Sequence, residues 1–160
     1  MSYNVLLQKS NDKRLLNNGI FNVNIDVNLS VFKKLKDFLA LQGINLNTID
    51  VISPQVANLI IYFDLPYPNN LKSWFNIIKY KKKSILFVYE PPMVNPFNYI
   101  KLFHKFFKRI FVWSDDSVDN KKYFKFHIQQ SGVGLQREKR SFAQKKFLVM
   151  ISGNLSLIHI

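Results

Sequence analysis

Short apolar runs alternate along the chain with stretches in which apolar residues recur at every third or fourth position. Nearly continuous apolar runs of strand length are typical of strands buried on both faces, and they occupy Asn58–Phe63, Ser84–Tyr89 and Ile110–Trp113. Phe21–Val27 also suits a strand because its side chains alternate, and Tyr123–Ile128 is expected to form a short edge strand. The pattern thus predicts five strands before residue 129.

Helical spacing fills the gaps between these strands. Ser30 stands at a helix N-cap position, the apolar residues after it form one helical face, and Gly43 ends that helix. A second helix is expected to begin at Asn69 or Asn70, and a third is expected over Tyr99–Ile110. Strands that alternate with helices predict an α/β fold, namely a Rossmann-like parallel sheet with crossover helices.

The C-terminal part of the chain interrupts this alternation. Gln129–Lys146 is polar and basic and is expected to be a linker, and Phe147–Ile151 is expected to be one more buried strand. Only Ser152–Ile160 follow, although a parallel strand needs a crossover helix after it. We therefore expect a Rossmann-like N-terminal domain over residues 1–140, and a linker with the start of a truncated second domain over residues 141–160.

Composition narrows the class of protein. Of the 160 residues 48% are apolar, which excludes a disordered basic tail, and the lack of cysteine excludes disulfides and thiolate chemistry. No apolar run approaches the roughly 18 residues of a membrane span, and Val5–Leu7 is too short for the core of a signal peptide. We expect an intracellular protein, in the cytoplasm or at the membrane periphery.

The net charge is 23 − 10 = +13, which predicts attraction to nucleic acid, anionic lipid or a phosphorylated substrate. Basic residues are spread over helix ends and loops, and aromatic residues fall at buried positions. Nucleic-acid-binding proteins more often gather both on one surface, so a nucleic-acid partner is not favoured. Solvated outer faces are the favoured explanation of the charge, followed by a peripheral membrane contact through Lys101–Arg109.

Three loops at the expected carboxyl ends of strands carry candidate chemistry, because ligands of open α/β sheets bind there. They are Asp64–Pro68, Glu90–Pro96 and Ser114–Asn120. Glu90 is the single Glu in the first 137 residues, and Pro91 confines it to extended geometry. A half-buried carboxylate at a strand end has a raised pKa, which suits a general base. The alternative is that Glu90 caps a helix or pairs with a lysine.

Other titratable residues suggest structural roles. Asp115, Asp116 and Asp119 could bind a divalent cation, but their loop lacks the Gly and Glu of an EF-hand, so helix capping is favoured and no metal site is expected. His104 is expected to be solvated on the polar face of its helix. It shares that face with Lys101, Lys105 and Lys108. No glycine-rich phosphate loop is present.

Three segments together resemble the acceptor-side domain of the family ten glycosyltransferases, the α1,3-fucosyltransferases. They are Ser84–Pro92, Asn98-Tyr99 and Phe107–Asp116. In that family a strand ends in Glu-Ser-Pro or a close variant, and an aromatic-rich helix and a strand with a Ser-Asp loop follow. Lys146–Asn154 is similar to the strand that opens the family's donor domain, so the resemblance covers roughly Ala57 to Asn154.

The resemblance implies one half of a GT-B arrangement, in which two Rossmann-like domains face a cleft. The implied activity is transfer of fucose from GDP-fucose to a glycan hydroxyl with inversion, and Glu90 matches the catalytic base. Substrate contacts are expected from Asn95, Tyr99, Ser114 and Asp115. No cofactor is implied beyond the GDP-sugar donor substrate, and its site lies mostly outside this chain, so the fragment alone is expected to be inactive.

Two alternatives stay open. One is a basic α/β module that binds nucleic acid or an anionic membrane surface without catalysis. The other is a catalytically inactive remnant of a transferase.

Overall fold

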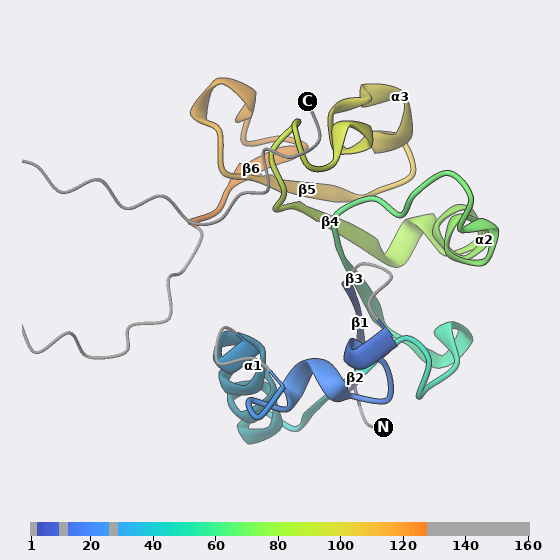
Figure 1. Cartoon of the computed structure of the whole chain (residues 1–160), viewed down its shortest axis with the longest axis vertical. Helices are drawn as coiled ribbons and strands as arrows, with labels where there is room; N and C mark the ends of the chain where they lie inside the picture. The colour runs from blue at the N-terminus through green and yellow to red at the C-terminus, as the bar shows by residue number, and fades with distance from the viewer. Residues whose placement is uncertain (1–2, 10–12, 26–28, 128–160) are drawn as a thin grey trace, which may run out of the picture.

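Six strands form one parallel sheet in the computed structural model, which describes residues 3–9, 13–25 and 29–127. The sheet order is β2-β1-β3-β4-β5-β6, and all five pairings are parallel (Figure 1). The strands are β1 (Tyr3–Lys9), β2 (Ile44–Thr48), β3 (Leu59–Phe63), β4 (Ser84–Val88), β5 (Arg109–Val112) and β6 (Tyr123–Lys125). The predicted α/β, Rossmann-like parallel sheet is confirmed.

Helices cover both faces of this sheet. Helix α1 (Ser30–Leu41) lies on one face, and α2 (Leu71–Lys79) and α3 (Lys101–His104) lie on the other (Figure 1). Short 3-10 helices occupy Lys13–Leu15, Gly19–Phe21, Pro54–Val56, Lys81–Lys83, Pro96–Tyr99 and Asp115–Ser117. None of the helices within the described ranges combines the length and the apolar character that a bilayer span requires.

The core has two halves because neighbouring side chains of a strand point to opposite faces. In β1, Leu6 packs in the cluster under α2 and α3, and Leu7 packs in the cluster under α1. Phenylalanine rings also stack across the α1 side of the sheet. The ring centroids of Phe63 in β3 and Phe87 in β4 are 5.0 Å apart. Those of Phe87 and Phe111 in β5 are 4.5 Å apart, and those of Phe111 and Phe124 in β6 are 5.8 Å apart.

The predicted helix ends agree with the structure at two places. The Asn70 side chain accepts a hydrogen bond from the Ser73 N–H at 3.1 Å, which starts α2. Gly43, with φ of 71°, follows the end of α1 in the left-handed region where glycine is at no disadvantage. Ser30 is the first residue of α1, and its N-cap is Leu29, which makes no side-chain capping bond.

The predicted strand Phe21–Val27 is wrong. Phe21 ends a 3-10 helix, and the amides of Asn22 and Ile25 bond to nearby carbonyls within turns, so they cannot join a strand ladder. Residues 26–28 lie outside the described residues. The pattern also missed β1 and β2, although β1 is an interior strand, paired on both sides.

The third predicted helix is much shorter than expected. Ile100 has extended geometry and separates the 3-10 helix Pro96–Tyr99 from α3, and the Lys108 N–H bonds to the Ser84 carbonyl at 2.9 Å, where pairing with β4 begins. The helical face predicted for Tyr99–Ile110 therefore does not exist as one surface. The linker, the strand Phe147–Ile151 and the second domain start, all expected after residue 128, lie outside the described residues.

Candidate functional site

Glu90 lies just beyond the carboxyl end of β4, as expected, and it is half-buried. Its backbone N–H and that of Tyr89 donate to the same oxygen, Oδ1 of Asp64, at 2.9 and 2.8 Å. Two consecutive amides held by one carboxylate fix the direction in which the chain leaves the strand. Among the described residues Glu90 forms no ion pair, so the alternative role as a lysine partner finds no contact there.

Asp64 is the residue on which this geometry depends. It follows β3 directly, is buried and has φ of 66°, and its own N–H donates to the Phe87 carbonyl at 2.8 Å. Its carboxylate accepts a third hydrogen bond from Asn98 Nδ2 at 2.6 Å. The sequence predicts chemistry in the loop that begins with Asp64 but does not distinguish this residue, and only its place directly after an apolar strand could have indicated it.

Asn98 connects the third segment of the site. It is fully buried, and its Oδ1 accepts from the Leu65 N–H at 2.7 Å. The next residue, Tyr99, donates its hydroxyl to the Glu90 carbonyl at 3.2 Å. The loops after β3 and β4 and the 3-10 helix Pro96–Tyr99 are thus joined by side chains that are themselves held in place.

The surroundings of Asp64 and Glu90 favour the protonated carboxyl group more than water does. Burial raises the pKa of Asp64, and its three hydrogen bonds and the charge of Lys9 oppose this. Burial also raises the pKa of Glu90, the negative charge of Asp64 adds to the rise, and Lys9 again opposes it. A carboxylate with a raised pKa binds a proton more readily near neutral pH, as a general base must.

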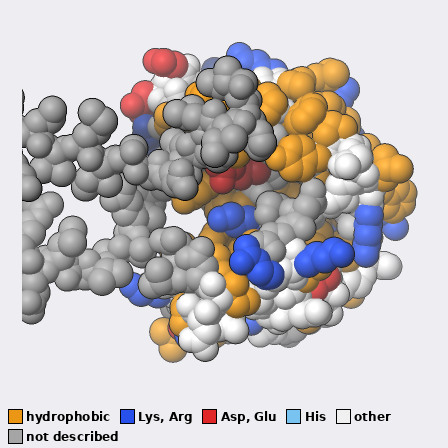
Figure 2. Space-filling view, in the orientation of Figure 1, with side chains coloured by type: hydrophobic (Ala, Val, Ile, Leu, Met, Phe, Trp, Pro, Cys, Tyr) orange, Lys and Arg blue, Asp and Glu red, His pale blue; other side chains and the backbone are white. Residues whose placement is uncertain are grey.

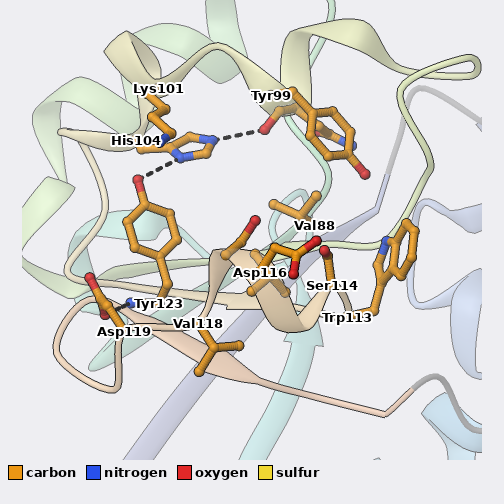
Figure 3. A pocket seen from close by; sticks show the side chains of 13 residues that line it. Val88, Tyr99, Lys101, His104, Trp113, Ser114, Asp116, Val118, Asp119 and Tyr123 are labelled. Carbon is orange, nitrogen blue, oxygen red and sulfur yellow. Dashed lines mark hydrogen bonds between the residues drawn. The ribbon is translucent and has the colours of Figure 1, made fainter.

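A cavity of about 300 Å³ opens beside this network, beyond the carboxyl ends of β4 and β5 (Figure 3). Aromatic rings of Tyr99 and Trp113 contribute to its wall, together with polar groups of Ser114, Asp116 and Tyr123. Glu90 is not part of this lining. It adjoins the cavity through Tyr99, whose ring lines the cavity and whose hydroxyl bonds to the Glu90 carbonyl.

His104 is buried, and the expectation that it is solvated is wrong. Its Nε2 lies 2.8 Å from the Asn98 carbonyl, which can only accept, so Nε2 carries the proton. In the neutral ring Nδ1 then accepts from the Tyr123 hydroxyl at 3.0 Å (Figure 3). Burial lowers the pKa of His104, the hydrogen bond to the Asn98 carbonyl opposes this, and the charges of Lys122 and Lys101 add to the lowering, so the neutral ring is favoured at neutral pH. The Tyr123 oxygen is left as an acceptor for a ligand hydroxyl.

The four predicted substrate contacts fall into two groups. Tyr99 and Ser114 line the cavity. Asn95 is buried away from it and donates to the Leu65 carbonyl at 3.0 Å. Asp115 is exposed and pairs with Lys125 at 2.7 Å, and it is the neighbouring Asp116 that reaches the cavity.

The acidic loop after β5 is held by backbone and lysine contacts. The Asp119 carboxylate accepts from the amides of Lys121, Lys122 and Tyr123, each at 2.8 Å, and these bonds lower the pKa of Asp119. This is capping of a turn rather than of a helix. In the part of the chain that the structure describes, no group of three or more His, Asp or Glu side chains could hold a metal ion.

Comparisons of the chain with protein-family models, with curated proteins and with solved structures find no match. Its function is therefore argued from its own residues. Those residues supply a half-buried glutamate whose backbone is held by Asp64, and beside it a cavity with aromatic and hydroxyl-bearing walls.

Proposed function

We propose that this chain is the acceptor-binding half of an inverting glycosyltransferase of GT-B type, with Glu90 as the general base. The observation that carries the proposal is the fixed position of Glu90: the buried Asp64 carboxylate holds its backbone, burial and then the charge of Asp64 raise its pKa, and Tyr99 connects it to a cavity suited to a sugar. The resemblance of Ser84–Pro92 to the α1,3-fucosyltransferases supports GDP-fucose as the donor.

The cavity has the composition that a sugar requires. Flat rings such as those of Trp113 and Tyr99 can pack on the apolar face of a pyranose and remain partly wet. Ser114, Asp116 and the Tyr123 hydroxyl can bond to sugar hydroxyls, and these few polar groups set the orientation. In this assignment the acceptor sugar lies in the cavity and presents one hydroxyl toward Glu90.

The reaction needs one proton to be removed. Glu90 takes the proton of the acceptor hydroxyl as that oxygen attacks the anomeric carbon of the donor, and GDP leaves from the opposite side with the bonding electrons. Inversion follows from this single displacement. The donor must be held in line by groups beyond the described residues, so residues 3–127 by themselves should catalyse no transfer.

The test is glycan binding by the 160-residue chain, screened on a glycan array and measured by NMR titration. Trp113→Ala should weaken binding by about tenfold or more, because it removes a stacking surface. Tyr3→Ala is the matched control, since Tyr3 is a similarly exposed aromatic at the start of β1, outside the cavity. Failure of every glycan to bind, or equal loss in both variants, would overturn the assignment of the cavity.

Glu90→Gln separates binding from catalysis. In a protein that also carries a donor-binding half, turnover should fall by about a hundredfold or more, because Gln keeps the size but accepts no proton. Glycan binding and thermal unfolding should change little. Near-normal turnover with lost stability would make Glu90 a structural residue.

A further inference from the structure

Helix α2 has apolar side chains on its outer surface as well as its inner one. Ile77 packs into the core, whereas Leu71, Phe75 and Ile78 are 75%, 63% and 51% exposed. These three positions recur at intervals of four and three residues, so they form one stripe on the helix. A helix that only covers a sheet would carry polar residues on that outer stripe.

The exposed apolar surface continues onto the neighbouring elements. Rings of Trp74 and Phe103 meet at 4.7 Å, which joins α2 to α3, and Leu102 beside this contact is 63% exposed. Figure 2 shows hydrophobic side chains gathered over α3 and α2. We call this surface, formed by the outer sides of α2 and α3 and by Lys81–Lys83, the α2–α3 face.

The charge on the segment that contains α2 and α3 is almost entirely positive. Residues 65–114 contain nine Lys and Arg and a single acidic residue, Glu90, so their net charge is 9 − 1 = +8. Glu90 belongs to the site at the carboxyl edge. An open hollow is lined by four lysines and one aromatic residue, namely Lys81, Lys82, Lys105, Lys108 and Phe107. Among the described residues none of these lysines pairs with a carboxylate.

We propose that the α2–α3 face binds the surface of an anionic lipid bilayer. Leu71, Phe75 and Leu102 enter the boundary between headgroups and acyl chains, and the lysines of the hollow contact lipid phosphates. The proposal goes beyond the transferase assignment and does not depend on it, because it uses neither Glu90 nor the cavity beside it.

The charge of the α2–α3 face and the shape of its side chains favour an anionic bilayer over two other partners. A second copy of the chain would bring two lysine-rich faces together, and the repulsion between their positive charges opposes a dimer through this face. Nucleic acid would satisfy the lysines, but aliphatic side chains such as Leu71 and Ile78 offer no ring on which bases stack. An anionic bilayer satisfies both kinds of residue at once.

The experiment is co-sedimentation of the 160-residue chain with vesicles of phosphatidylcholine containing about a quarter phosphatidylglycerol. The chain should bind these vesicles and bind pure phosphatidylcholine at least about tenfold more weakly, since each lysine near an anionic surface contributes about fivefold in affinity. Added salt should weaken the binding.

One double variant and one triple variant, each with a matched control, locate the binding surface. Leu71→Ser with Phe75→Ser should reduce vesicle binding by about tenfold or more, whereas Leu41→Ser with Phe38→Ser, on the outer surface of α1, should not. The charge variant replaces Lys81, Lys82 and Lys105 with Gln, and its control replaces Lys13, Lys34 and Lys121, so both lose the same charge. Circular dichroism checks that all four variants are folded.

Four results would overturn the proposal. The first is equal binding to charged and neutral vesicles or to neither, and the second is equal loss in a variant and its control. The third is tighter binding to RNA or DNA that depends on the same lysines and ignores the Leu71 and Phe75 changes, which would make the face a nucleic-acid surface. The fourth is vesicle binding that survives both α2–α3 variants, which would place the membrane-binding surface elsewhere on the chain.

Discussion

A single buried carboxylate, that of Asp64, has two effects on Glu90. Its hydrogen bonds fix the backbone of Tyr89 and Glu90, and its charge raises the pKa of the Glu90 side chain. The Lys9 ammonium acts in the opposite direction, because its positive charge lowers the pKa of the same group. Burial makes the largest contribution to the raised pKa of Glu90, and two neighbours of opposite charge at the ends of adjacent strands, β3 and β1, adjust it in opposite directions.

This balance predicts shifts of opposite sign in two variants. Asp64→Asn keeps an oxygen for the three donors but removes the charge, so the pKa of Glu90 should fall. Lys9→Gln removes the opposing charge, so the pKa should rise. Carboxyl carbon NMR of the 160-residue chain measures both titrations, with Asp37→Asn on α1 as a control that should leave Glu90 unchanged. Shifts of the same sign in both variants would contradict the balance.

Single positions also show where prediction from the sequence reaches its limit. The position of Glu90 could be predicted, because a residue directly after an apolar strand lies at the carboxyl edge of the sheet. The burial of His104 could not, because its expected exposure assumed a helical face over Tyr99–Ile110, and α3 is only four residues long. The role of Asp64 depends on a contact with Asn98, 34 residues away, which no local pattern contains.

At the scale of elements, prediction succeeded where apolar character was continuous. Strands β3, β4 and β5 were predicted to within one residue at each end, because strands buried on both faces need nearly unbroken apolar runs. Strand β2 (Ile44–Thr48) has asparagine at alternate positions and reads as a loop. Segment Phe21–Val27 has strand-like alternation, but Phe21 instead ends a 3-10 helix that packs Ile20 and Phe21 under α1, and Val23 to Ile25 form a turn.

The turn after α1 allows a test of backbone conformation alone. Gly43 has φ of 71°, and a Cβ added there would meet no atom within 4 Å. Gly43→Ala should therefore destabilise the fold by about 1 kcal/mol, through left-handed strain only, and Gly43→Asn should cost less because Asn tolerates this region. Urea unfolding of the three proteins gives the comparison. A neutral Ala variant would mean that the turn relaxes to another conformation.

For the whole molecule, the buried neutral His104 couples folding to pH. The folded state holds its pKa below the ordinary 6.5, so below that pH the unfolded chain binds a proton that the folded chain rejects. Stability from this residue is thus complete above about pH 6.5 and is lost as the pH falls, by up to about 1.4 kcal/mol per pH unit. Asp64 and Glu90, whose pKa values are raised, act in the opposite sense.

The measurement is therefore a difference between two proteins. The free energy of unfolding of the wild-type chain minus that of His104→Gln should shrink between pH 7 and pH 5, because the variant lacks the titrating ring. His127→Gln, which changes an exposed histidine, is the matched control and should show no such trend. A difference that is constant with pH would contradict this account, because it would mean that His104 binds its proton equally well in the folded and the unfolded chain.

Strand β1 pairs on both sides with strands that come much later in the sequence. During synthesis β1 leaves the ribosome before the other described strands, and its neighbours are far behind it: Tyr3 pairs with Ile44, 44 − 3 = 41 residues later, and Val5 pairs with Leu59, 59 − 5 = 54 residues later. Until β2 is made, the apolar run Val5–Leu7 has no strand to pair with, and until β3 is made one of its two edges stays open. Parallel pairings over such separations also form slowly. The nascent chain therefore carries an unpaired, aggregation-prone strand for much of its synthesis.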